Sequence, residues 1–156
     1  LISNEAYKSS EIEGELLDRE SLHSSIKRHF GYHESTSRNH PREDGIAEMM
    51  IDLYHHFEAP LTHEILYSWH LMLMNGRRDL TAIGSYRTHK EPMQVVSGYT
   101  HKRNVHFEAP PSDEMNAQMS VFINWFNLTS PKGKKPLPAI TRAGIAHLYF
   151  VSIHAF

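Results

Sequence analysis

The apolar segment 138–153 constrains the fold of this chain more than any other feature, because a helix of this composition needs partners to cover it. The segment ends in Ile153-His154-Ala155-Phe156. We expect a buried, central helix that delivers His154 at its C-terminal end. Imidazole titrates near neutral pH, so His154 is a candidate general base, although a histidine at such a place is more often only a boundary residue.

Apolar residues recur at helical spacing in three further segments, which predict helices at about 44–58, 62–74 and 112–126. Their buried stripes are expected to be Ile46, Met49, Met50, Leu53 and Phe57, then Ile65, Trp69, Met72 and Leu73, then Met115, Met119, Phe122 and Phe126. Thr62 and Ser112 are the predicted caps of the second and third. The fold class is therefore mainly α.

Two shorter helices are expected near the N-terminus. The first covers 4–13 and stops at Gly14, and the second is capped by Asp18 or Ser21 and runs to about Phe30. The polar segment 31–41 between this pair and the next helix is a predicted loop.

One β-hairpin interrupts the helical pattern. The runs 93–96 and 104–107 have strand-like composition, and 97–103 reads as the turn between them. A hairpin is marginally stable alone, so we expect it to rest on the helices. Its outer edge is open to pairing with another chain, which leaves a homo-oligomer as one of the alternatives.

Composition narrows the class of protein. The 156 residues predict one compact domain, and a formal net charge of −2 argues against a dedicated nucleic-acid binder. The chain has no cysteine, so it has neither disulfides nor a thiolate zinc site, which fits a cytoplasmic protein. No signal peptide or membrane span is evident.

The 13 histidines raise the question of a metal site. His29 and His33 have ligand spacing, but Gly31 interrupts their helix; His63-Glu64 lacks a second histidine, and His147 with His154 makes only half a site. We predict no metal site within this chain. Neither a Walker loop nor a serine in a nucleophile elbow is present.

Three pieces of the sequence together resemble the Fic-domain family, which transfers AMP from ATP to protein hydroxyls. Ile153-His154-Ala155-Phe156 resembles the start of the family motif, His-x-Phe followed by an acidic residue and Gly-Asn-Gly-Arg. Ser9 to Gly14 resembles the inhibitory motif. Gly84-Ser85-Tyr86-Arg87, the hairpin and 105–111 resemble the flap region. The resemblance divides the chain into an inhibitory helix, 1–15, and the N-terminal part of a Fic core, 16–156, with a flap at about 84–111.

The resemblance implies a mechanism. His154 would take the proton from a Ser, Thr or Tyr hydroxyl of a target protein, while Mg²⁺ would assist departure of pyrophosphate from ATP. The flap would hold the target by strand addition, through Met93, Gln94, Val95, Val96, Val105, His106 and Phe107. The acidic metal ligand and the phosphate-binding loop are expected beyond Phe156, so we expect the chain to be a fragment that is inactive alone.

The inhibitory motif implies regulation. Ser9, Glu13 and Gly14 would form an N-terminal inhibitory segment. In it, the Glu13 carboxylate would pair with an arginine of the family motif and would repel the γ-phosphate of ATP. This requires the inhibitory helix to pack near the end of the central helix. The alternatives are removal of AMP from a target, transfer of another phosphate-containing group, and a catalytically inactive module that binds a peptide.

Overall fold

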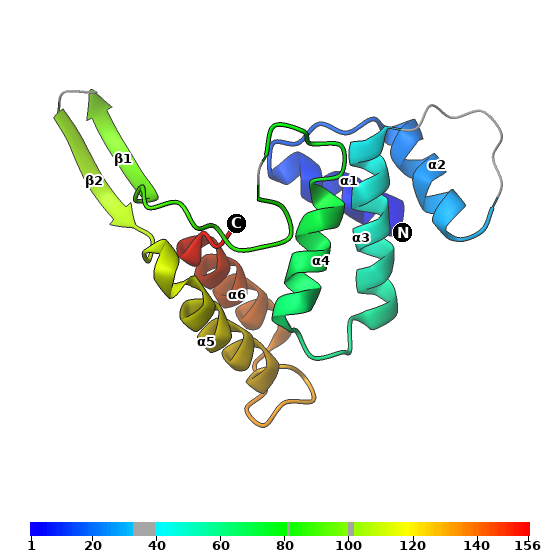
Figure 1. Ribbon diagram of the computed structural model, residues 1–156. Coiled ribbons are helices and arrows are strands. Elements are labelled where there is room, and N and C mark those ends of the chain that lie inside the picture. Colours follow the sequence, from blue (N-terminus) through cyan, green and yellow to red (C-terminus); the bar gives the residue numbers. More distant parts are fainter. Residues whose placement is uncertain (33–39, 81, 100–101) are drawn as a thin grey trace. The chain divides into compact units, whose positions relative to one another are not determined.

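The computed structural model describes residues 1–32, 40–80, 82–99 and 102–156, in which helices predominate beside one hairpin (Figure 1). The elements in chain order are α1 (Ile2–Ile12), α2 (Arg19–His29), α3 (Pro41–His56), α4 (His63–Leu73), β1 (Gln94–Tyr99), β2 (Lys102–Glu108), the 3-10 helix η1 (Ser112–Glu114), α5 (Met115–Leu128) and α6 (Ala139–Ile153). The predicted fold class, mainly α with a β-hairpin, is confirmed. Most of the predicted loop at 31–41 lies outside the described residues.

The chain forms two compact units. The first contains Leu1–Ala59 and Tyr67–Gly84, and the second contains Pro60–Leu66 and Ser85–Phe156. Each is described by itself below.

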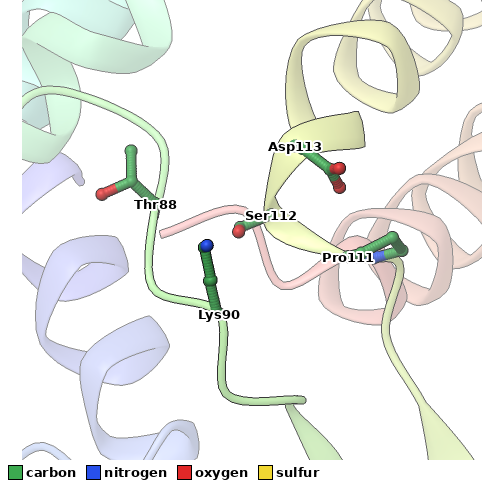
Figure 2. Close-up of a pocket in the computed structure, with 5 residues that line it drawn as sticks. All are labelled: Thr88, Lys90, Pro111, Ser112 and Asp113. Atoms are coloured by element: carbon green, nitrogen blue, oxygen red, sulfur yellow. The ribbon is translucent and has the colours of Figure 1, made fainter.

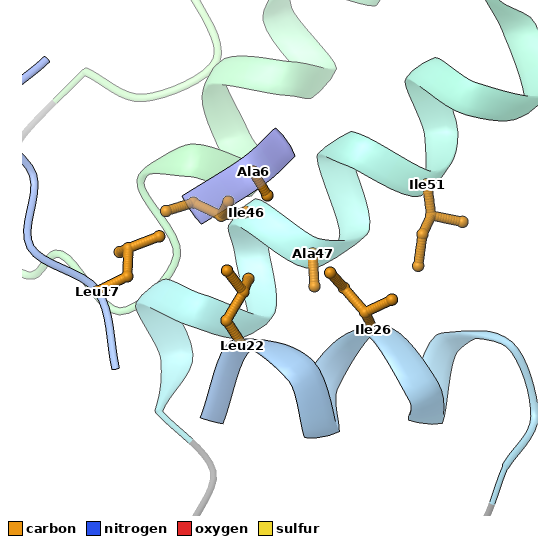
Figure 3. Packing of buried hydrophobic residues seen from close by; sticks show 7 residues of the cluster. All are labelled: Ala6, Leu17, Leu22, Ile26, Ile46, Ala47 and Ile51. Atoms are coloured by element: carbon orange, nitrogen blue, oxygen red, sulfur yellow. The ribbon is translucent and has the colours of Figure 1, made fainter. Parts of the chain in front are cut away.

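The core of the first unit lies where α1, α2 and α3 meet. Figure 3 shows the aliphatic side chains that fill it, which are Ala6, Leu17, Leu22, Ile26, Ile46, Ala47 and Ile51. A buried Leu or Ile side chain stabilises a fold by roughly 1.5–3 kcal/mol relative to exposure, so this cluster accounts for the packing of three short helices.

Polar contacts fix the start of α2 within the same unit. The Asp18 carboxylate accepts a hydrogen bond from the Ser21 amide at 2.7 Å, so Asp18, and not Ser21, is the cap of the two that were predicted. The Asp18 amide in turn donates to the buried Glu43 carboxylate of α3 at 3.0 Å. One residue therefore caps α2 and ties it to α3.

In the second unit, α5 and α6 pack antiparallel through aromatic rings. The Phe122 ring lies 5.3 Å from Tyr149 and 5.6 Å from Phe150. Near the other end of α6, the Arg142 guanidinium donates to the Phe126 carbonyl at 3.0 Å and covers the Phe126 ring. The Asn127 side chain pairs with both backbone groups of Leu61, which attaches the 60–66 segment to this unit.

The expected burial of the 138–153 helix is wrong for this chain. Ile153 is the residue of α6 that is buried, whereas Ile140 is 90% exposed and Leu148 is 66% exposed. The physical reason is that α5 covers one side of α6, and the described part of the chain brings no second element of its unit against the opposite side. An apolar composition predicts that a helix is more stable when its side chains are buried, but it does not determine which other elements pack against it.

Several predicted details also need correction. Phe57 is 70% exposed because α3 ends at His56, and Leu73 is exposed whereas Leu66 is the buried residue of α4. Ser112 does not cap a long helix, since it is the first residue of the 3-10 turn η1, which precedes α5. α1 and α3 begin earlier than expected, at Ile2 and Pro41.

The hairpin extends away from α5 and α6 instead of resting on them (Figure 1). Every described residue of β1 and β2 is exposed, so the prediction that helices support the strands is wrong. The strands pair antiparallel with an irregularity in register between Val95 and Val96, because Val95 faces Phe107 and Val96 faces Val105. The extra residue, His106, lies in the resulting bulge and contacts the Ser97 hydroxyl at 2.7 Å.

Candidate active site

His154 follows directly after the last residue of α6 and has a left-handed backbone. Its φ is 50° and its ψ is 56°, and it is the one non-glycine residue with positive φ among the described residues. Its amide still bonds to the Phe150 carbonyl at 3.3 Å, and its side chain is exposed. The chain turns sharply at this residue, so the imidazole is presented at the end of the helix and not along its side.

Arg87 holds the backbone of this turn. Its Nε donates to the His154 carbonyl at 2.6 Å, and its amide donates to the Ala155 carbonyl at 2.8 Å. Its Nη2 donates to the Pro110 carbonyl at 2.5 Å, just after the end of β2. The guanidinium of Arg87 therefore bonds both to His154, whose side chain is the candidate base, and to Pro110, at the stem of the hairpin where β2 has just ended.

Burial and backbone carbonyls act in opposite directions on the charge of Arg87. The residue is only 6% exposed, and this burial lowers the pKa of its guanidinium from the ordinary value. Its partners are backbone carbonyls at the C-terminus of α6, where the helix dipole favours positive charge. Sequence reasoning placed Arg87 within the flap region but assigned it no role.

Aromatic side chains hold the residues that follow His154. The buried Tyr86 ring lies 5.2 Å from the Phe156 ring, and Ala155, which precedes Phe156 in the sequence, is buried. The Tyr86 hydroxyl lies 2.6 Å from His63 Nδ1. Tyr86 and Arg87, neighbours in sequence, thus fix the side chain of Phe156 and the backbone of His154 respectively.

The protons of the His63 network can be assigned from its acceptors. The Ser120 hydroxyl donates to the Asn116 carbonyl at 2.6 Å, so it accepts from His63 Nε2 at 3.1 Å. In a neutral ring, His63 Nδ1 is then the acceptor for the Tyr86 hydroxyl. His63, considered above as a metal ligand, instead joins Tyr86 to α5.

The residues predicted to bind a target lie along the hairpin. Gln94, Val95 and Val96 belong to β1, whereas Val105, His106 and Phe107 belong to β2, and all six are exposed. Met93 precedes β1, and its carbonyl accepts from the Ala109 amide at 2.8 Å, closing the stem. The described strands form a two-stranded sheet, so each keeps an outer edge that pairs with no described strand.

A pocket of about 450 Å³ lies at the base of the hairpin (Figure 2). Its lining residues flank the two strands and are Thr88, Lys90, Pro111, Ser112 and Asp113. The Lys90 ammonium points toward Ser112 in this view. The pocket has the size of a small-molecule site and carries charges of both signs, and the sequence alone did not indicate it.

The predicted inhibitory residues belong to the first unit. Ser9 lies in the last turn of α1, Glu13 follows the helix as its C-cap, and Gly14 has a φ of +80°. All three are exposed, and the Glu13 amide bonds to the Ser9 carbonyl at 3.3 Å. The motif residues are thus brought together at one helix end, and their inhibitory role stays a prediction.

The candidate metal ligands do not assemble. No three His, Asp or Glu side chains in the described part of the chain lie close enough to hold an ion. His29 contacts Asp44 at 3.2 Å, and its predicted partner His33 lies outside the described residues. No described helix is long and apolar enough to span a bilayer.

Comparison with solved structures identifies the fold. Over 99% of this chain, a Fic family protein from Desulfovibrio desulfuricans G20 matches with 23% identity and a TM-score of 0.57. A Fic domain containing signaling protein from Bacteroides thetaiotaomicron VPI-5482 matches over 99% of the chain with 19% identity and a TM-score of 0.60. The chain spans 42% and 53% of these two proteins. No curated protein sequence matches.

Two family models match the sequence. Residues 1–32 match a domain of unknown function (DUF4172), and residues 60–156 match the Fic/DOC family. The second match covers more than half of the 156 residues and includes His154, Arg87 and the hairpin. The chain therefore belongs to the Fic/DOC family.

Proposed function

We propose that this chain is part of a protein adenylyltransferase, which transfers AMP from ATP to a Ser, Thr or Tyr hydroxyl of a target protein. Membership of the Fic/DOC family supports a Fic-type transferase. The observation that carries the proposal is His154, whose exposed imidazole ends α6 on a turn that Arg87 holds by two hydrogen bonds. An imidazole carried on a fixed backbone turn beside the hairpin suits proton transfer from the hydroxyl of a docked protein.

The proposed reaction is a single in-line displacement at the α-phosphorus of ATP. His154 accepts the hydroxyl proton as the target oxygen forms a bond to that phosphorus. The bond from the α-phosphorus to the bridging oxygen breaks, and pyrophosphate leaves with the bonding electrons. ATP and Mg²⁺ are therefore the proposed donor and cofactor; Mg²⁺ would offset phosphate charge, and its ligands are expected among residues other than those described.

The hairpin is the proposed docking element for the target. Its strand residues are exposed and its outer edges are unpaired by any described strand, which suits strand addition by an extended segment. The shared guanidinium of Arg87 places the stem of the hairpin beside the turn at His154. A target strand that pairs with the hairpin would bring a hydroxyl close to the imidazole.

The test is transfer of label from ATP by the whole protein. We expect label from α-³²P-ATP, but not from γ-³²P-ATP, to enter a protein target. His154→Ala should lower the rate at least ~100-fold, the usual contribution of a general base. His147→Ala is the matched control, because His147 is an exposed histidine of the same helix and has no assigned role.

Each other outcome has a distinct meaning. Incorporation of γ-label would point to phosphoryl transfer, and release of AMP from a modified target would point to the reverse reaction. No labelling by any preparation, together with binding of a peptide, would favour an inactive peptide-binding module. An unchanged rate for His154→Ala would remove the imidazole from the mechanism.

A further inference from the structure

Arg87 has no assigned part in binding or proton transfer in the proposed reaction, yet it contacts the backbone on both sides of the candidate site. A buried guanidinium is costly unless its charge and its N–H groups are satisfied. Here Nε, Nη2 and the backbone amide each donate to a different carbonyl, those of His154, Pro110 and Ala155. Two of these acceptors belong to the turn that carries the candidate base, and the third belongs to the hairpin stem.

The turn at His154 needs such support. A non-glycine residue in the left-handed region is strained, and this strain persists only where the surroundings enforce it. The carbonyl of His154 points back toward Arg87 because of its positive φ and ψ, and the following carbonyl bonds to the Arg87 amide. Arg87 is thus the residue whose contacts favour the left-handed backbone over continuation of the helix.

We propose that Arg87 is a positioning residue, which holds His154 in its left-handed turn and ties that turn to the hairpin stem. This inference rests on the proposed function insofar as His154 is the base. It predicts that loss of the guanidinium misplaces the imidazole without removing any group that touches ATP or the target.

Lysine cannot replace Arg87 in this role. The planar guanidinium directs Nε and Nη2 at two carbonyls in a fixed geometry, 2.6 Å and 2.5 Å away. An ammonium group keeps the positive charge but concentrates its donors at one point. Arg87→Lys therefore separates the geometry of the contacts from their charge.

Arg142 provides a matched control on the same helix. Its side chain also donates to a backbone carbonyl, that of Phe126, and burial also lowers the pKa of its guanidinium. It lies in the first turn of α6, whereas His154 follows the last. Arg142→Lys should therefore cause the same general loss of side-chain packing as Arg87→Lys, but it should leave the turn at His154 undisturbed.

The experiment combines kinetics with NMR on the whole protein. For Arg87→Lys we expect kcat for AMP transfer to fall roughly 10- to 100-fold, with KM for ATP within about twofold of the unmodified protein. The ¹³Cα and ¹³Cβ shifts of His154 should move from left-handed values toward helical ones. Arg142→Lys should leave both kcat and these shifts unchanged.

The unmodified protein offers a direct measurement. A through-hydrogen-bond coupling is expected between Arg87 Nε and the carbonyl carbon of His154, and its absence would overturn the proposal even if Arg87→Lys did not fold. Unchanged kcat in Arg87→Lys, retained left-handed shifts, or an equal loss in Arg142→Lys would overturn it too. If the unmodified protein transfers no AMP, the proposed function fails, while the coupling and the shifts still decide the role of Arg87.

Discussion

Gly45 lies in the interior of α3, close to the backbone of Met72 in α4. A methyl group at this position would collide with the Met72 carbonyl oxygen and would lie 2.9 Å from the Asn75 side chain. Glycine is unfavourable within a helix, so its presence here is explained by the close approach of the two backbones. A residue that looks like a helix weakness in sequence is a packing requirement in the structure.

Gly45→Ala is expected to lower the free energy of unfolding by about 1–3 kcal/mol, because the added methyl group must push two helices apart. Gly144→Ala is the matched control, since Gly144 also lies within a helix but has nothing within 4 Å of an added methyl group. That substitution should raise stability by about 0.5–1 kcal/mol. Urea denaturation measures both, and a stabilising Gly45→Ala would contradict the close approach.

His70 connects α4 to the segment that precedes the hairpin. Its Nδ1 accepts a hydrogen bond from the Gly84 amide at 3.1 Å, which requires a neutral ring with its proton on Nε2. Burial lowers the pKa of His70 below its ordinary value of 6.5. The folded state therefore favours the neutral form.

This pKa direction predicts how stability changes with pH. The contribution of His70 is fully present above its ordinary pKa of 6.5, and it is lost as pH falls through the lowered pKa of the folded state. Hydrogen exchange of the Gly84 amide should therefore accelerate on acidification below that range, after correction for intrinsic rates. His70→Gln keeps an acceptor but does not titrate, so its exchange should lose this dependence; an identical pH profile would exclude His70 as the cause.

At the scale of elements, the hairpin and α6 show that a sequence pattern predicts secondary structure better than it predicts burial. Strand-like composition predicted two strands, and both form, but they extend into the segment 97–103 that was predicted to be the turn. Their exposure was not predictable, because a pattern reports which side chains prefer burial and not which neighbours are present. The same limit explains α6, whose apolar sequence predicted its helix correctly but its burial incorrectly.

The docking role of the hairpin predicts the effect of Val96→Pro in β1. Proline removes a backbone N–H and is tolerated poorly in a strand, so it should weaken pairing with a target segment. We expect KM for a protein target to rise roughly 10-fold, with KM for ATP unchanged, because about one hydrogen bond is lost. Val96→Thr keeps the N–H and the strand preference and should behave as the unmodified protein. A target KM that does not respond to Val96→Pro would argue for docking elsewhere.

At the scale of the whole molecule, α1 both contributes to the core of the first unit and carries the predicted inhibitory residues. Its Ala6 packs in the core of the first unit, so the helix is structurally part of that unit. Its C-terminal end exposes Ser9, Glu13 and Gly14, which are the residues of the predicted inhibitory segment. A substitution at the exposed end can therefore test regulation without disturbing the core.

Glu13→Gly is expected to raise the rate of AMP transfer by the whole protein, because it removes a carboxylate proposed to repel the γ-phosphate of ATP. Glu11→Gly serves as a control, since Glu11 is also exposed near the end of α1 but pairs with Lys8. Initial rates with α-labelled ATP measure the effect. Equal rates for Glu13→Gly and the unmodified protein would contradict autoinhibition by this residue.

The sequence by itself determined the elements and the family resemblance. Apolar spacing, the Asp18 cap and the Gly14 stop depend on contacts within a few residues, so local chemistry predicts them. The His154 motif and the flap segment were recognised for the same reason, because their residues are contiguous. The tertiary structure alone decided that the Arg87 guanidinium joins Pro110 to His154, since these contacts link residues 23 and 67 positions apart. It also decided which side of α6 is covered, because burial depends on the neighbours that folding brings together.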